Sequence, residues 1–157
     1  MLEVNVKTTE PKTVAFISMR GPYDLIPQAM GALYGWVQSH GYTPVGMPSG
    51  VYLSDPATVE QSQAMWMLRA PIADDVADAP PDEAGCGIEH IAAHLVAATV
   101  HRGPYDTVEA TYRALGEWVG ANGYRMVGPP EEFYLSDPDE TAPEDDLTEI
   151  HFSVEKT

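Results

Sequence analysis

The sequence has few of the features that mark secreted and membrane proteins. Cys86 is its single cysteine, which excludes an internal disulfide framework. No apolar run approaches the roughly 20 residues that a bilayer-spanning helix needs. The N-terminus also lacks a basic segment followed by an apolar one, so no signal peptide is evident. The sequence therefore predicts a cytoplasmic protein without a membrane partner.

Positive charge is scarce as well. The 157 residues include 8 lysines and arginines against 24 aspartates and glutamates, which gives a net charge of −16. A surface this negative repels phosphate backbones and argues against nucleic-acid binding. It favours cationic ligands or basic protein partners, although the charge could also serve solubility alone.

The motifs of several enzyme classes are missing too. The chain has no P-loop, no glycine-rich dinucleotide fingerprint and no cysteine nucleophile signature. His90 and His94 are four residues apart, but they form no H-E-x-x-H sequence and no third ligand is evident. Neither Ser54 nor Ser136 has a histidine at a fixed offset, as a duplicated catalytic arrangement would require. We expect no metal and no cofactor.

The chain does contain one stretch twice. Residues 20–56 match residues 102–138 at a constant offset of 82, with 19 identities in 37 positions. Chance would give about two, so the match indicates an internal duplication. Both copies begin with Arg-Gly-Pro-Tyr-Asp and end with Tyr-Leu-Ser-Asp-Pro, and both contain Trp-Val and Gly-Tyr. Two copies of this length suggest two half-domains that share one core.

Hydrophobic periodicity predicts the same order of elements in each copy. Apolar residues at spacings of three and four predict helices over 25–40 and from Asp106 to Gly123, with Trp36 and Trp118 as core anchors. Alternating or β-branched runs predict eight strands. These are residues 2–7, 14–19, 50–54, 64–72, 86–92, 95–101, 132–136 and 147–154.

The ends of both helices have specific residues. Asp24 and Asp106 can accept hydrogen bonds from free backbone N–H groups and are expected to act as N-caps. Gly41 and Gly123 are expected to end the helices, because glycine adopts the left-handed conformation at little cost.

These elements predict one α+β domain over residues 1–157. Each half is ββαββ, with the repeats at 1–72 and 84–154 and an acidic, proline-containing linker or flexible loop at 73–83. We expect an approximate twofold between the halves, a continuous antiparallel sheet and both helices on one face. Such an arrangement leaves a groove near the twofold axis, where a ligand could bind.

Positions at which the halves differ suggest a site. Glu149 corresponds to Met67, and Tyr112 on the second helix corresponds to Met30 on the first. Glu149 is expected to point away from the helices, because Ile150 and its alternate neighbours form the apolar face. Desolvation would raise the pKa of an unpaired carboxylate there, and a bound cation would relieve the cost. The alternative is an exposed strand residue paired with a lysine or arginine.

The order of these motifs resembles that of the GyrI-like effector-binding domains. The resemblance rests on the doubled Arg-Gly-Pro-Tyr, Trp-Val, Gly-Tyr and Tyr-Leu-Ser-Asp-Pro pattern and on the closing Thr148-Glu149-Ile150. It implies a pair of SH2-like halves with a ligand groove. It also implies a last-strand glutamate, here Glu149, that meets cationic aromatic compounds. The implied groove residues are Glu149, Tyr112, Met30, Met67 and Trp66, and His151 and Arg69 depart from the pattern.

The resemblance implies a stand-alone member, because the first predicted strand begins at Leu2 without a DNA-binding region before it. Our leading hypothesis is a protein that binds a small hydrophobic or cationic compound. A second hypothesis is a hydrolase of strained, cyclopropane-bearing toxins, with Glu149 as general base and Tyr112 or His151 as proton donor. A third is an acidic inhibitor of DNA gyrase. These alternatives leave open whether the chain is an enzyme.

Overall fold

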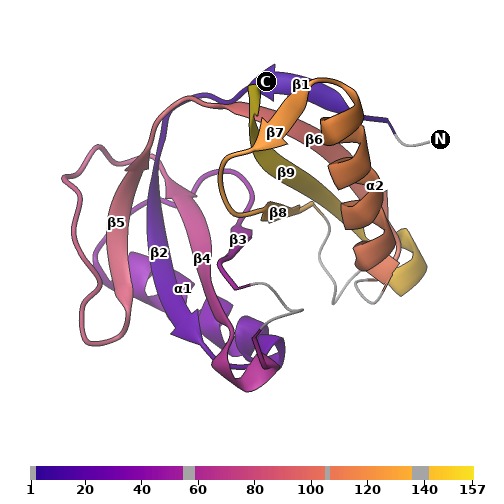
Figure 1. The fold of residues 1–157 in the computed structure, drawn as a ribbon. Coiled ribbons are helices and arrows are strands. Elements are labelled where there is room, and N and C mark those ends of the chain that lie inside the picture. Colours follow the sequence, from indigo (N-terminus) through magenta and orange to yellow (C-terminus); the bar gives the residue numbers. More distant parts are fainter. Residues whose placement is uncertain (1–2, 55–58, 105–106, 136–141) are drawn as a thin grey trace. The chain divides into compact units, whose positions relative to one another are not determined.

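The computed structural model describes residues 3–54, 59–104, 107–135 and 142–157 (Figure 1). The described residues form two α-helices and nine strands, and every strand pairing described below is antiparallel, so the fold class is α+β as predicted. The chain divides into two compact units. We call Glu10–Ala93 the central unit, and Met1–Thr9 together with His94–Thr157 the terminal unit.

The central unit has the strand order β3-β4-β2-β5. Its strands are β2 (Lys12–Arg20), β3 (Ser49–Tyr52), β4 (Met65–Ile72) and β5 (Cys86–Ile91). Helix α1 (Ile26–Ser39) packs against β2 and β4 (Figure 1). The core of this unit joins Leu33 and Val37 of the helix to alternate residues of the strands, among them Trp66 and Leu68.

The terminal unit has the strand order β1-β6-β9-β8, and β7 also pairs with β9. Its strands are β1 (Asn5–Thr8), β6 (Leu95–Arg102), β7 (Tyr124–Met126), β8 (Glu131–Tyr134) and β9 (Leu147–Lys156). Helix α2 (Val108–Ala121) packs on this sheet through Leu115 and Val119. In Figure 1, α2 runs alongside β6 and β9.

The first strands of the two repeats are exchanged between the units. Strand β1 belongs to the first repeat, but it pairs with β6 of the second repeat, with Val6 opposite Ala97. Strand β5 opens the second repeat, but it pairs with β2 of the first repeat, with Ile88 opposite Ala15. Each unit therefore contains strands from both repeats. The twofold and the groove between the halves stay predictions.

Glycines explain two of the duplicated motifs. Gly21 and Gly103, in the two Arg-Gly-Pro-Tyr turns, have φ angles of 136° and 123°, which other residues rarely adopt. Gly41 and Gly123 follow the helices with φ angles of 74° and 80°. The predicted helix stops are therefore confirmed.

The predicted cap at Asp24 and the two tryptophan anchors differ from the structure. Asp24 lies within a 3-10 turn, η1 (Tyr23–Leu25), and α1 begins after it without a side-chain cap. Asp106 and the second Tyr-Leu-Ser-Asp-Pro motif beyond Leu135 lie outside the described residues. Trp36 and Trp118 are only half-buried, at the edges of the two cores. The Trp36 indole N–H donates to Asp82 at 2.8 Å, because the amphipathic ring keeps its polar edge near solvent.

Residues 73–83, expected as a linker or flexible loop, are hydrogen-bonded to the rest of the central unit. Ala79 exchanges two backbone hydrogen bonds with Ile88, both at 3.0 Å. The Asp82 carboxylate accepts from the backbone N–H of Ala84 and of Cys86. The hydrogen bond from Trp36 is the main reason that the pKa of Asp82 is low.

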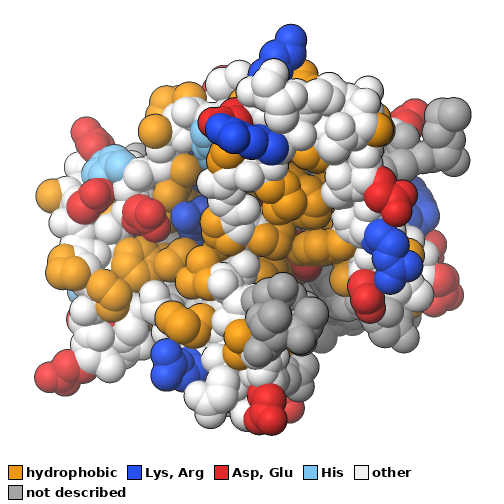
Figure 2. Space-filling view, in the orientation of Figure 1, with side chains coloured by type: hydrophobic (Ala, Val, Ile, Leu, Met, Phe, Trp, Pro, Cys, Tyr) orange, Lys and Arg blue, Asp and Glu red, His pale blue; other side chains and the backbone are white. Residues whose placement is uncertain are grey.

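Figure 2 shows acidic side chains spread over the visible face, with hydrophobic side chains among them. None of the helices in the described ranges is long and apolar enough to cross a membrane.

Candidate functional site

Strand β9 sends alternate side chains to two faces of the terminal unit's sheet. Ile150, Phe152 and Val154 are buried in the core under α2. Glu149 and His151 point to the opposite face, because successive strand residues alternate. This confirms the division of faces predicted from the sequence.

Glu149 is a paired carboxylate. Its Oε2 accepts hydrogen bonds from Lys7 Nζ at 3.1 Å and from His151 Nε2 at 2.5 Å. Burial acts to raise the pKa of Glu149, but the hydrogen bonds from His151 and Lys7 outweigh it and hold the pKa below its ordinary value. The raised pKa expected from the sequence is therefore wrong. The structure shows instead the alternative of a strand carboxylate paired with a lysine.

His151 is a buried partner of this carboxylate. Burial lowers the pKa of His151 and outweighs the hydrogen bond to Glu149, which acts in the opposite direction. The neutral ring then donates its Nε2–H to Glu149. The Phe133 ring contacts His151 at a centroid distance of 4.5 Å, and Glu131 lies opposite it in the β8–β9 register. This environment keeps His151 fixed in position next to a carboxylate of low pKa.

Tyr112 lies on the helix-covered face of the same sheet, opposite to Glu149. Its ring meets Phe152 edge to face at 5.7 Å, and its hydroxyl donates to the carboxylate of Glu132. The sequence grouped Tyr112 with Glu149 because both break the symmetry of the repeat. In the structure, the sheet separates them.

Glu132 is the acidic residue that the sequence analysis missed. It lies on β8 opposite Ile150, on the helix-covered face, and it is only 6% exposed. Two features of the sequence point to it. Of the consecutive Glu131 and Glu132, one must face inward in a strand, and Glu132 corresponds to Gly50 in the first repeat.

More polar groups lie on this face, near the start of α2. His101 is buried on β6, and both of its ring nitrogens have partners. Nδ1 pairs with Thr111 Oγ1 at 2.7 Å, and Nε2 pairs with Thr107 Oγ1 at 3.1 Å and the Pro104 carbonyl at 3.2 Å. Thr148 lies opposite His101 in the β6–β9 register and is 0% exposed. A polar cluster thus underlies α2 in the terminal unit.

Three residues predicted for the site belong to the central unit. Trp66 is 1% exposed within the core, and its indole N–H donates to the Gly21 carbonyl at 2.9 Å. Met30 packs half-buried against that core. Met67 is half-buried on the other face of β4, since it alternates with Trp66 and Leu68. Trp66 therefore has almost no ring surface exposed to a ligand.

The histidines with four-residue spacing have separate partners. His90 forms a hydrogen bond with the Asp78 carboxylate, and this bond raises the pKa of His90. The ring of His94 pairs through Nδ1 with Thr9 Oγ1 at 3.0 Å. Within the described ranges, no group of three or more His, Cys, Asp or Glu side chains is arranged to hold a metal ion.

Solved structures share the fold. The C-terminal domain of EcmrR aligns with a TM-score of 0.85 and 20% identity, over 100% of this chain and 99% of that domain. A hydrolase from Listeria innocua aligns with a TM-score of 0.74 and 15% identity, over 98% and 92% of the two chains. SAV2435, bound to tetraphenylphosphonium, aligns with a TM-score of 0.59 and 15% identity, over 98% and 94%. At these identities the likeness shows the fold alone.

The comparisons also bear on length and family. The chain spans 58% of the EcmrR chain in the EcmrR–DNA complex. No curated protein matches the sequence. The family model described as a GyrI-like small molecule binding domain matches residues 2–155. The chain therefore belongs to the GyrI-like family.

Proposed function

We propose that this chain binds hydrophobic compounds that carry a positive charge, with Glu132 as the negative group that they meet. The observation that carries the proposal is a carboxylate that is 6% exposed, under a helix, in a domain of a small-molecule-binding family. A carboxylate shielded from water attracts a cationic ligand more strongly than an exposed one does, because little solvent screens the pair.

The side chains near Glu132 suit an aromatic compound. Tyr112 donates to the carboxylate and presents its ring beside Phe152. Aromatic faces attract cations by about 0.5–2 kcal/mol, according to how far the cation is desolvated. SAV2435, which shares the fold, is shown with tetraphenylphosphonium, an aromatic cation of this class.

Glu149 is the carboxylate that the sequence analysis favoured, and it stays a competing proposal. Lys7 Nζ lies 3.1 Å from the Glu149 carboxylate, at the position that a ligand cation would take. A cation would have to displace Lys7 to reach it. We therefore favour Glu132.

Titration with tetraphenylphosphonium tests the proposal. The wild-type chain should bind it, and Glu132→Gln should weaken binding by about 1–3 kcal/mol, since a charged partner is lost. Calorimetry measures the change. Glu149→Gln is the matched control, an identical substitution on the opposite face, and it should leave the affinity within about twofold. If only Glu149→Gln weakens binding, the site lies on the other face of the sheet.

Hydrolysis is a second candidate, because structures from Listeria innocua with this fold are named hydrolases. The roles predicted from the sequence would make Glu149 the general base. Its pKa is lowered, however, and Tyr112 lies on the opposite face, so His151 is the one predicted donor beside it. Turnover of a cyclopropane-bearing electrophile that Glu149→Gln abolishes would support this candidate. Turnover that survives the substitution would exclude these roles.

A further inference from the structure

Thr148 carries a buried hydroxyl that no group in the described part of the chain satisfies. Its side chain is 0% exposed, and among the described residues Oγ1 has no hydrogen-bond partner. Leaving a buried polar group unpaired costs about 1–3 kcal/mol. Valine has nearly the same shape and would avoid that cost. The hydroxyl is therefore a feature that the core of the terminal unit does not need for packing.

The strand register shows which residues surround this hydroxyl. Thr148 lies between His101 on β6 and Tyr134 on β8, and all three point under α2. Both nitrogens of His101 are already bonded to other groups. Glu132 is the diagonal neighbour of Thr148 across the β8–β9 pair. Diagonal neighbours on one sheet face are about 7–8 Å apart, so one small molecule could reach both.

The sequence repeat shows how the two units differ at this position. Thr148 corresponds to Trp66 at the offset of 82 residues, and both occupy the same place in their sheets. Trp66 lies between Met19 and Tyr52, as Thr148 lies between His101 and Tyr134. The indole of Trp66 fills the core of the central unit and satisfies its own N–H at Gly21. In the terminal unit the same position holds a threonine, which has no ring.

We propose that Thr148 is a specificity-determining residue that hydrogen-bonds a ligand at this position. The inference rests on the proposed function and deepens it. The ligand is a hydrophobic aromatic cation that carries a hydroxyl, carbonyl or amine group about 7–8 Å from the point where its charge meets Glu132. A ring of the ligand takes the position that Trp66 fills in the other unit.

Tetraphenylphosphonium and its three mono-hydroxylated isomers test this inference. Tetraphenylphosphonium has no hydrogen-bonding group, whereas a hydroxyl on one ring can reach Thr148. The wild-type chain should prefer at least one isomer over the parent compound by about 3- to 10-fold, the strength of one net hydrogen bond. Thr148→Val should remove that preference without changing the affinity for the parent, and Thr148→Ser should keep it.

Two further measurements separate this role from a structural one. Thr148→Val should unfold at the same or a higher temperature than wild type, because it removes an unsatisfied buried group. Thr148→Trp places in the terminal unit the ring that the central unit already holds, and it should prevent binding of all four probes.

The outcomes distinguish this inference from the proposed function. If tetraphenylphosphonium binds but no isomer is preferred, or Thr148→Val keeps the preference, Thr148 does not contact the ligand. If Thr148→Val also lowers the unfolding temperature, the hydroxyl has a structural partner such as a buried water, and the inference fails. If none of the four compounds binds to the wild-type chain, the proposed function fails with it.

Discussion

At the scale of single residues, the contacts of Glu149 and His151 predict how stability depends on pH. The folded chain holds the pKa of His151 below its ordinary value of 6.5, and that of Glu149 below its ordinary value of 4.5. In both cases the unfolded chain binds the proton at a higher pH than the folded chain. The protein therefore loses stability in acid. The contribution of His151 is lost as the pH falls below about 6.5, and that of Glu149 as the pH falls below about 4.5.

We expect His151→Gln to reduce the loss of stability between pH 7.5 and 5. Glutamine can still donate a hydrogen bond to Glu149, but it does not titrate, so the unfolded state gains no proton at this position. Urea unfolding at pH 7.5, 6 and 5 measures the effect. A variant with the same slope as wild type would show that His151 is not held neutral by burial.

His90 gives the control of opposite sign. Its pKa is raised by the hydrogen bond with Asp78, so its stabilising contribution is present in acid and is lost as the pH rises. His90→Gln should therefore make the acid loss slightly steeper. The effect should be small, because this pair is exposed.

The sequence could predict which residues face which way on β9, but not their partners. Alternation of apolar residues places Ile150 and Glu149 on opposite faces whatever the rest of the fold does. Lys7 is 142 residues from Glu149, and the two meet because β1 pairs with β6, next to β9. No periodicity within a segment carries that information, so the ion pair and the low pKa of Glu149 appear only in the structure.

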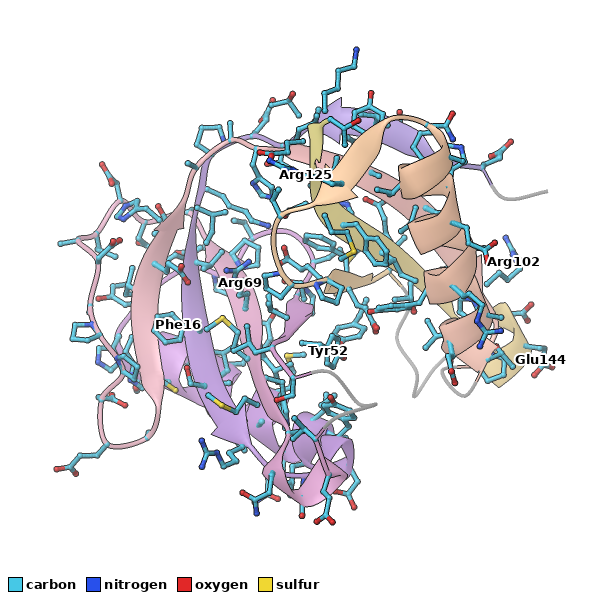
Figure 3. All side chains as sticks on the ribbon, viewed as in Figure 1. Phe16, Tyr52, Arg69, Arg102, Arg125 and Glu144 are labelled. Carbon is cyan, nitrogen blue, oxygen red and sulfur yellow. The ribbon has the colours of Figure 1, made fainter. Side chains whose placement is uncertain are left out.

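At the scale of elements, the central sheet depends on a glycine where β5 meets β2. Gly87 lies opposite Phe16, and a Cβ on it would come within 2.3 Å of the Ala79 carbonyl oxygen and 2.7 Å of the Phe16 ring. Phe16 in turn lies opposite Arg69 on β4, and Figure 3 labels both. The segment before β5 can approach the strand this closely because Gly87 has no side chain.

Gly87→Ala should therefore lower the free energy of unfolding by about 1–3 kcal/mol, as overpacking against backbone does. The matched control is Gly31→Ala, on α1, where an added Cβ meets nothing within 4 Å. That substitution should raise stability by roughly 0.5–1 kcal/mol, because glycine is a poor helix former. Thermal unfolding of both variants measures these two changes in stability. Equal effects would mean that Ala79 moves aside at no cost.

Element types followed from the sequence more readily than element ends. Both helices and eight strands were predicted, because each has a sustained period of its own. Strand β7 was missed, since its three residues directly follow Gly123 and are too few to show alternation. The N-cap at Asp24 was wrong, because the residues after the Arg-Gly-Pro-Tyr turn first form the 3-10 turn η1.

At the scale of the whole molecule, the sequence repeat and the folded unit are different divisions of the chain. The repeat is evident from identity at a fixed offset, and it predicts the order of both helices and of every strand except β7. It could not show that β1 and β5 are exchanged, because an internal comparison contains no information about which strand pairs with which. The exchange assigns Val4 and Val6 to the core of the terminal unit and Cys86 and Ile88 to that of the central unit.

This division predicts which fragments fold. Residues 10–93 hold every strand of the central sheet together with α1, whereas residues 1–83, of nearly equal length, hold the first repeat and the segment after it. The fragment 1–83 lacks Ile88, whose burial contributes about 1.5–3 kcal/mol. It also keeps β1 without its partner β6.

We expect residues 10–93 to unfold cooperatively and residues 1–83 to unfold at a lower urea concentration, or without a cooperative transition. Circular dichroism during urea unfolding measures both fragments at equal concentration, and size-exclusion chromatography detects association through the unpaired edge of β2. Equal midpoints would show that the sequence repeat is itself the folding unit. The exchange of β1 and β5 would then contribute little to the stability of either half, because each half would hold its core without the strand supplied from the other repeat.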